Sequence, residues 1–580
     1  MRTFGLTRGV GQAYSTLGKR GRTMAHDLVV KNGLVVDGTG SPGFEADVAI
    51  AGGTIADIGK NVGPGTTEID ARGQVVAPGF IDSHTHMDLF IVQYPHGNPV
   101  VNYGVTSIVI GDCGASIAPV PPVGEPRDVL IKYLRRVLDD YVNDDDWKWT
   151  TFPEYLDYLE GRVGVNVAAL VPHSPVRLVV MGEAAYQREA TPEELEAMKQ
   201  MVREGMEAGG IGFSSSPRGG PAIHAGTPST LATQEEMAAL ANVAGEYGGC
   251  FQFNGFGNLL KPESGFPELV EKINVPMIGN EFRVRPGEKA DGERAIEYMK
   301  EARERGKDIY GVVIPYSHIR RFDVDDCFIF DGLPLWEEIK QDRGELARKL
   351  QDPDVRRRLD EQRRENAGEP AYIEWLGWQG VYFDVMQRED LRSREGQNVA
   401  EIAAASGKSE SDAFFDTWLE DGLASKLYYQ GFANGHMGLL ADMIKTTEGL
   451  IGTDAGAHLD RFFWHGAPTR VLGHWRRDKG LFNLEEAVHK VTGHPAAKLR
   501  MNRGILKTGL PADVTVFDPD KVDDLASKRM PKKLDENEIF RHPPGIGAVV
   551  VNGEVVLEDG ECKDVFPGQV RRQQLFVPGQ

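Results

Sequence analysis

The chain is poor in cysteine, has no long apolar run and carries fewer basic than acidic residues. Each of these scarcities excludes a class of protein. Four cysteines among 580 residues are too few for a disulfide framework, so we expect a reducing compartment, the cytoplasm. No run of about 18 apolar residues occurs, so no membrane-spanning helix is predicted. The 65 basic and 86 acidic side chains leave a net charge of −21, which repels phosphate backbones and argues against nucleic-acid binding.

The first 23 residues differ from the rest because they carry basic and no acidic side chains. An organellar transit peptide is one interpretation, but these residues lack the apolar stretch of a secretory signal. The interpretation that we favour is that Met24 is the true start and that residues 1–23 form a disordered extension. Patterned sequence begins only at Asp27.

Both ends of the patterned region show short β-strands joined by turn dipeptides. Asn32-Gly33 and Gly52-Gly53 separate apolar runs near the start, and Asn552-Gly553 does so near the end. Each of these pairs predicts a two-residue β-hairpin. Because chain termini often lie close together, we predict one small β-sandwich domain built from residues 24–79 and 509–580.

Between these ends, apolar runs alternate with helical stretches, which predicts a (β/α)8 barrel over residues 80–508. Capping boxes at Thr191 to Glu194 and Thr233 to Glu236 mark two helix starts. A doubly wound sheet is the second architecture, but it would need a glycine-rich loop after Ile81, and none follows. The predicted strands are 80–84, 106–110, 165–171, 211–214, 250–254, 275–279, 309–314 and 449–453.

The last two predicted strands are separated by far more chain than one crossover helix needs. Residues 340–365 interleave acidic and basic side chains, with leucines at roughly helical spacing. This pattern is typical of an exposed helix face. We therefore predict a helical insertion over about residues 315–435.

Ligand-type side chains gather where predicted strands end, which is where barrel enzymes place their chemistry. His84 and His86 end the first strand on the same side, Cys113 follows the second, and Asp454 follows the eighth. Imidazole, thiolate and carboxylate all bind zinc. Such an ion would lower the pKa of a water toward ~7 and polarise a carbonyl, and Asp454 could take the proton of that water. The strand ends therefore predict metal-assisted hydrolysis of an amide-like bond.

Several segments resemble the amidohydrolase superfamily and, more narrowly, its N-acyl-D-amino-acid deacylase (D-aminoacylase) branch. They are VAPGFIDSHTHMD, GVTSIVIGDCG, GTDAGAH, RVLGHWRRDKGLFNLEEAVHKVTGHPA and GLPADVTVFDPDKVDD. The resemblance covers about residues 26–285 and 436–560. It implies the same barrel with a β-domain from both termini. It also implies that His84 and His86 are metal ligands, that Cys113 replaces the carbamylated lysine of other amidohydrolases, and that Asp454 is both ligand and general base.

The chain departs from that branch at the fifth and sixth strands, where D-aminoacylases place histidines that bind the tight zinc with the cysteine. Asn254 stands where the first histidine is expected and Glu281 where the second is expected. Glu281 could still ligate zinc, whereas an asparagine amide is a poor ligand. We therefore expect one zinc per chain, near His84, His86 and Asp454 with Cys113 beside it.

Further residues are candidates for binding substrate. Arg283 matches the offset of a family lysine that holds the substrate carboxylate, and guanidinium binds carboxylate through two parallel hydrogen bonds. Arg461 is a weaker anion-site candidate, and Asn254 is a further candidate for binding substrate. His173 and His436 could line the pocket, because loops after barrel strands build the site.

The sequence thus predicts a metal-dependent hydrolase of a non-peptide C–N bond, in an N-acyl-(D-)amino acid. Hydrolysis of another amide, a cyclic amide, an ester or a lactone at the same site is the alternative. A non-catalytic scaffold is a third hypothesis, which the retained ligands disfavour. The substrate is expected to be a small molecule with a carboxylate, and the oligomeric state, a homo-oligomer included, is left open.

Overall fold

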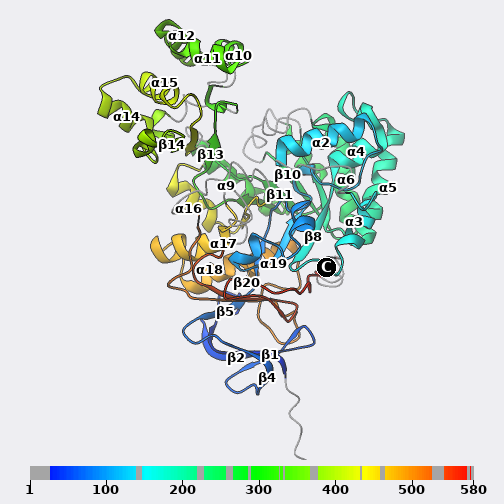
Figure 1. The fold of residues 1–580 in the computed structure, drawn as a ribbon. Coiled ribbons are helices and arrows are strands. Elements are labelled where there is room, and N and C mark those ends of the chain that lie inside the picture. The colour runs from blue at the N-terminus through cyan, green and yellow to red at the C-terminus, as the bar shows by residue number, and fades with distance from the viewer. Residues whose placement is uncertain are drawn as a thin grey trace, which may run out of the picture.

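The computed structural model describes residues 26–570 and Leu575, apart from 139–146, 218–226, 256–264, 285–288, 326, 331–332, 366–376, 432–433, 457–463 and 526–540. Figure 1 shows three regions stacked along the molecule: a β-sheet region at one end, a barrel in the middle and an insertion beyond it. No helix in the described residues is long and apolar enough to cross a membrane. The predicted extension, residues 1–23, lies outside the described residues.

The barrel is an eight-stranded sheet of parallel pairs in the order β16-β12-β11-β10-β9-β8-β7-β6. The first and last strands also meet, because Ser83 N donates to Ile451 O at 3.2 Å and Asp454 N donates to His84 O at 3.1 Å. All eight predicted strands are present, which confirms the barrel over the doubly wound alternative. Their bounds are β6 Phe80–Asp82, β7 Val105–Ile110, β8 Asn166–Pro172, β9 Gly212–Ser215, β10 Cys250–Asn254, β11 Met277–Asn280, β12 Ile309–Val313 and β16 Gly449–Ile451.

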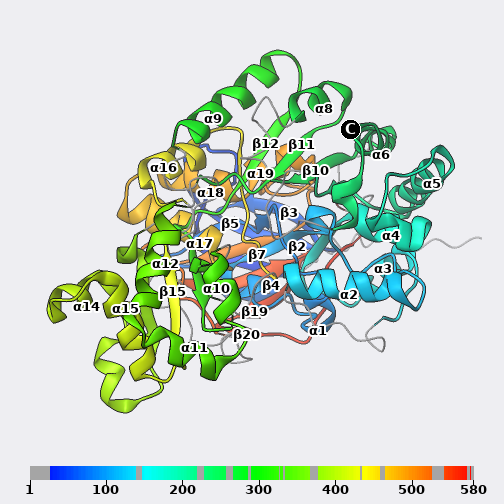
Figure 2. The same ribbon diagram turned by 90° about the horizontal axis from the view of Figure 1, so that it is seen from above.

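Helices surround the barrel (Figure 2). The capping box at Thr191 is present, with reciprocal bonds between Thr191 and Glu194. The second predicted box is only half formed, because Thr233 accepts from the Glu236 N–H while the Glu236 carboxylate turns to His173 instead. The main helices are α2 Glu125–Leu138, α3 Phe152–Leu159, α4 His173–Met181, α5 Pro192–Ala208, α6 Gln234–Glu246, α8 Phe266–Lys272, α9 Lys289–Glu304, α16 Met437–Lys445, α17 Ala467–Arg470, α18 Leu484–Val491 and α19 Gly493–Leu499.

The end region is one nine-stranded sheet to which both chain ends contribute, in the order β20-β19-β18-β17-β5-β1-β2-β3 with β4 on β1. It curls around a shared apolar core that includes Val30, Ile50, Val514 and Val550. The strands are β1 His26–Val35, β2 Phe44–Ala51, β3 Thr54–Gly59, β4 Gly65–Asp70, β5 Val75–Pro78, β17 Val514–Phe517, β18 Ile546–Val551, β19 Glu554–Glu558 and β20 Glu561–Cys562.

Two of the three predicted hairpins are present in this sheet and one is wrong. Gly52-Gly53 joins β2 to β3, and Asn552-Gly553 joins β18 to β19. Asn32-Gly33 instead lies inside β1, where the pairing with β2 shifts register. Asn32 takes a left-handed φ of 60° there, as in a β-bulge. The bulge lets the first half of β1 pair with β4 and the last residues pair with β5.

The insertion contains helices and also a three-stranded antiparallel sheet, in the order β13-β15-β14, that the sequence did not predict. It has its own apolar core, in which Phe330, Phe414 and Trp418 pack together. Its elements are β13 Ile319–Phe322, α10 Pro334–Ile339, α11 Arg343–Leu350, α12 Pro353–Glu365, β14 Val381–Val385, α14 Val399–Ser406, α15 Glu410–Glu420 and β15 Lys426–Gln430.

Candidate metal centre

His84 and His86 follow β6 and point into the interior of the barrel mouth. They are 0% and 3% exposed, and their rings lie edge to face with centroids 5.2 Å apart. Asp454 follows β16, the strand that closes the barrel against β6. Its Oδ1 lies 3.4 Å from His84 Nε2 and 3.5 Å from His86 Nε2. Three side chains from the two strand ends that meet at the seam therefore converge on one point.

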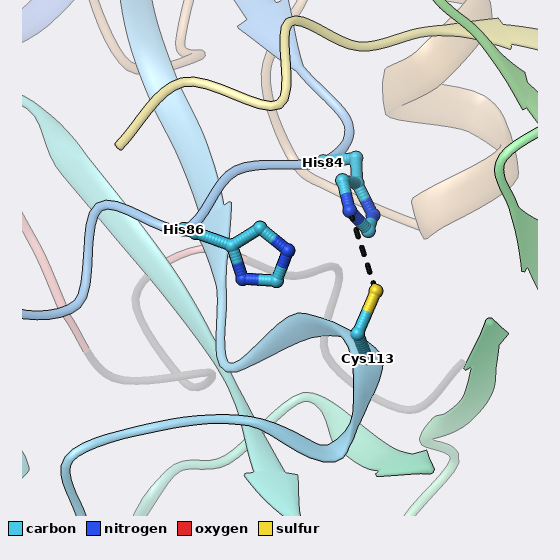
Figure 3. A group of neighbouring side chains, drawn as sticks. All are labelled: His84, His86 and Cys113. Atoms are coloured by element: carbon cyan, nitrogen blue, oxygen red, sulfur yellow. Dashed lines mark hydrogen bonds between the residues drawn. The ribbon is translucent and has the colours of Figure 1, made fainter. Parts of the chain in front are cut away.

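Cys113 joins this point from the end of β7 (Figure 3). Its Sγ lies 3.7 Å from His84 Nε2. The ligand atoms of His84, His86 and Cys113 all lie within 4.8 Å of one another, and all three side chains are buried. The thiol is brought there by a tight turn in which Cys113 itself adopts a left-handed φ of 58°.

Three of the six distances among these four ligand atoms match the ligand-to-ligand distances around a zinc ion. With Zn–N and Zn–O near 2.1 Å and Zn–S near 2.3 Å, such distances are about 3.4 Å between N or O atoms and about 3.6 Å between N and S. The observed 3.4, 3.5 and 3.7 Å lie within about 0.1 Å of these lengths. The two nitrogens and the sulfur form one cluster, and a carboxylate oxygen lies beside both nitrogens, so this set of donors suits a divalent zinc-like ion.

Asp112 orients one of the imidazoles. Its Oδ1 lies 3.1 Å from His84 Nδ1, and both side chains are fully buried. A carboxylate on Nδ1 leaves Nε2 for the metal, which is how metal-bound histidines are usually held. Burial opposes the charged imidazole, but Asp112 and Cys113 outweigh it and raise the pKa of His84 well above its ordinary value. A site that attracts positive charge this strongly suits a cation.

The far side of the Cys113 sulfur meets amides instead of histidines. Asn280 Nδ2 lies 3.4 Å from Sγ and Gln252 Nε2 lies 3.9 Å from it. Asn254, the residue expected at a histidine position, is buried at the end of β10, where it pairs with Asn280 across the sheet. A carboxamide nitrogen donates hydrogen bonds and carries no lone pair for a metal. The sequence singled out neither Gln252 nor Asn280.

Glu281 belongs to a neighbouring cluster of charged side chains. Its Oε1 lies 2.7 Å from His318 Nε2 and its Oε2 lies 3.2 Å from Arg283 Nη1. Burial raises the pKa of Glu281, but His318 and Arg283 together lower it below its ordinary range. His318 is fully buried, and its ring lies tilted against that of Trp464 with centroids 4.4 Å apart. The sequence did not predict it, because a lone histidine carries no motif.

The other substrate-binding candidates lie in different settings. His173 is fully buried, with Nδ1 2.9 Å from Ser215 Oγ and Nε2 2.8 Å from Glu236 Oε1. Both ring nitrogens therefore have protein partners. His436 is exposed at the start of α16. Arg461 lies outside the described residues.

Comparison with known proteins shows which family the chain belongs to. A model described as "Amidohydrolase family" matches residues 67–250. The D-aminoacylase of Alcaligenes xylosoxydans xylosoxydans is 30% identical to this chain, over 94% of this chain and 96% of its own length. The chain belongs to the D-aminoacylase family of amidohydrolases.

Solved structures of this family share the fold. A D-aminoacylase with what is described as a binuclear metal centre, with "one-metal activation and second-metal attenuation", has a TM-score of 0.65 and 26% identity, covering 95% of this chain and 100% of that one. The N-acyl-D-glutamate deacylase of Bordetella bronchiseptica, in complex with zinc and a phosphonate inhibitor, has a TM-score of 0.64 and 25% identity, covering 94% and 100%. Family membership confirms the predicted resemblance and fold.

Proposed function

We propose that this protein is a metal-dependent amidohydrolase that cleaves the amide bond of an N-acyl-D-amino acid. The observation that carries the proposal is the convergence of His84, His86, Cys113 and Asp454 at distances that suit one ion. That site lies at the mouth of a barrel whose relatives are D-aminoacylases.

His84, His86, Cys113 and Asp454 would hold the ion. When bound, a zinc ion lowers the pKa of a water and polarises an amide carbonyl. Asp454 accepts the proton of the attacking water at its carboxylate and delivers it to the leaving amine, so that the C–N bond breaks with the amine neutral. Asp112 keeps the His84 ring in place throughout, through the 3.1 Å contact to Nδ1.

We propose a single metal per chain. The second position in a binuclear centre would need ligands beyond Cys113, and the groups beside the sulfur are the amides of Asn280 and Gln252. Glu281, the remaining candidate, has each carboxylate oxygen engaged, one by His318 and the other by Arg283. Zinc suits the nitrogen, sulfur and oxygen donor set.

Arg283 is the proposed partner of the substrate carboxylate. It is 21% exposed, and its guanidinium touches Glu281 through Nη1. A guanidinium has five N–H donors, so a carboxylate can be bound without breaking that contact. The relatives named N-acyl-D-aspartate deacylase and N-acyl-D-glutamate deacylase carry acidic substrates in their names. We propose that the substrate of this protein likewise bears a carboxylate.

The four cysteines are all free, and a Cys113 thiol that must stay reduced to bind metal suits a reducing compartment such as the cytoplasm.

We also propose that residues 24–79 and 509–580 act as one structural domain beside the 80–508 barrel. The insertion at about 315–435 would be a subdomain of that barrel.

The test is a substrate panel run on metal-free and zinc-loaded protein. N-acyl-D-amino acids, their L-enantiomers, and a cyclic amide, an ester and a lactone would be compared by kcat/KM. We expect zinc-dependent turnover of an N-acyl-D-amino acid above all others. Turnover of the cyclic amide, ester or lactone alone would support the alternative hydrolase, and no turnover with zinc bound would support the scaffold.

A further inference from the structure

Three consecutive serines, Ser214 to Ser216, lie at the end of β9 and just after it, beside the turn that carries Cys113. They carry no nucleophile motif, and the metal site does not use them as ligands. In the structure all three are buried, at 0 to 1% exposure. Because side chains alternate along a strand, Ser214 and Ser216 face the turn while Ser215 faces the outer helices.

The turn from Gly111 to Gly114 has an unusual backbone. Gly111, Cys113 and Gly114 have φ values of 78°, 58° and 66°, all in the left-handed region. A Cβ at Gly114 would lie 2.9 Å from Ser215 Cα, and one at Gly111 would lie 2.3 Å from Leu170 O. The two glycines are therefore required both by conformation and by close packing. A left-handed cysteine has no such freedom and needs surrounding contacts to hold it.

Side chains supply those contacts, because the turn is not part of a strand and does not pair with a neighbour as a strand does. Ser214 Oγ accepts from Gly114 N at 3.1 Å and donates to Gly111 O. Ser216 Oγ donates to Cys113 O at 2.6 Å. Buried peptide groups need such partners, since each one left unsatisfied costs free energy comparable to a lost hydrogen bond.

The outward serine is anchored separately. Ser215 Oγ lies 2.9 Å from His173 Nδ1, whose Nε2 contacts Glu236, and Glu236 also pairs with the fully buried Arg177. Burial lowers the pKa of His173, so the neutral ring can accept from Ser215 and donate to Glu236. This network ties β9 to α4 and α6 on the side away from the metal centre.

We propose that Ser214 and Ser216 are positioning residues that hold the Cys113 thiol in reach of the metal. Ser215 instead stabilises the packing of β9 against α4 and α6. This inference rests on the proposed function, because it assigns a role toward the metal that His84, His86, Cys113 and Asp454 would bind. Groups that orient metal ligands typically change metal affinity by about 10- to 100-fold when they are removed.

The experiment compares Ser214→Ala, Ser216→Ala and Ser215→Ala with wild type. Zinc affinity is measured by competition with a chelator, and cobalt-loaded protein is examined for the thiolate-to-metal absorption band. Ser107→Ala is the matched control, because Ser107 is a fully buried serine of the same barrel that contacts Asn166 in the first part of β8. Thermal unfolding of the metal-free proteins reports stability separately from metal binding.

We expect Ser214→Ala and Ser216→Ala to weaken zinc binding by about 10- to 100-fold and to shift or weaken the cobalt–thiolate band. Ser215→Ala should lower the midpoint of thermal unfolding. Its zinc affinity should change by less than about threefold, as should that of the Ser107→Ala control. Ser216→Thr, which keeps a hydroxyl, should recover affinity relative to Ser216→Ala. Equal losses of affinity in all four serine-to-alanine variants, or none in Ser214→Ala and Ser216→Ala, would overturn the inference. A wild type that binds no zinc would overturn the proposed function instead.

Discussion

Asp454 offers the sharpest test of the chemistry, because its surroundings favour one particular replacement. Its backbone has a left-handed φ of 56°, a conformation in which asparagine and aspartate are enriched and alanine is strained. Asp454→Asn therefore keeps the backbone, and its amide oxygen can remain near the two imidazoles. What it loses is the ability to accept a proton.

The expected loss follows from the position of the carboxylate. Oδ1 lies 3.4 and 3.5 Å from the two imidazole nitrogens, so the carboxylate sits beside the point where water would be activated. Removing a well-placed general base costs about 10²- to 10⁴-fold in rate. We expect about 10³-fold in kcat, or about 4 kcal/mol in activation free energy.

The assay measures kcat on the best N-acyl-D-amino acid, zinc content per chain and the unfolding temperature, for wild type and Asp454→Asn. Asp442→Asn is the matched control, because Asp442 is an exposed carboxylate on α16. The control should match wild type in all three. Near-full kcat in Asp454→Asn with zinc retained would refute the assignment of Asp454 as the base.

Other predictions concern substrate binding, the second metal position and the buried network. Arg283→Ala should lower kcat/KM by about 30- to 1,000-fold for a carboxylate-bearing substrate, mainly through KM, and should matter little for an uncharged analogue; equal losses on both would mean that Arg283 acts through structure. Asn280→His should allow a second zinc to bind beside the Cys113 sulfur at excess metal; an unchanged zinc count would show that the amide is not what closes that position. Burial opposes ionisation of Glu236, but His173 and Arg177 hold its pKa below the ordinary 4.5. Its stabilising effect is then complete above about pH 4.5 and is lost as the pH falls below that value. Glu236→Gln should reduce the free energy of unfolding by about 3 to 5 kcal/mol at neutral pH and flatten its decline in acid, and an unaltered acid limb in denaturant titrations would contradict this.

The barrel could be predicted from sequence because each strand is a short apolar run between helical stretches, and all eight runs form strands. The sequence could not show whether Asn32-Gly33 forms a hairpin turn or a bulge. The same dipeptide suits a two-residue turn and a left-handed bulge, and only the pairing of β1 with β4 and β5 decides between them. The sheet of the insertion could not be predicted, because its strands are far apart in the sequence. Ile319–Phe322, for example, pairs with Lys426–Gln430.

Within the site, the proposed ligands could be picked out from the sequence because they follow strands in recognisable motifs. The structure brings His84, His86 and Cys113 into one cluster and places Asp454 beside both imidazoles. At the sixth strand, matching residue positions to those of D-aminoacylases did not predict which side chain lies beside the sulfur. There Asn280 contacts the sulfur, and Glu281, one residue later, turns to His318. A one-residue change along a strand moves a side chain to the other face, and spacing alone does not fix which residue points inward.

The central claim is that one metal ion binds at His84, His86, Cys113 and Asp454. The most direct measurement is the zinc count per chain by mass spectrometry after loading with excess zinc and desalting, in wild type and in His84→Ala. We expect one zinc per chain in wild type and a large loss of zinc in the variant. Two zinc ions per chain in wild type, or one retained in His84→Ala, would contradict it.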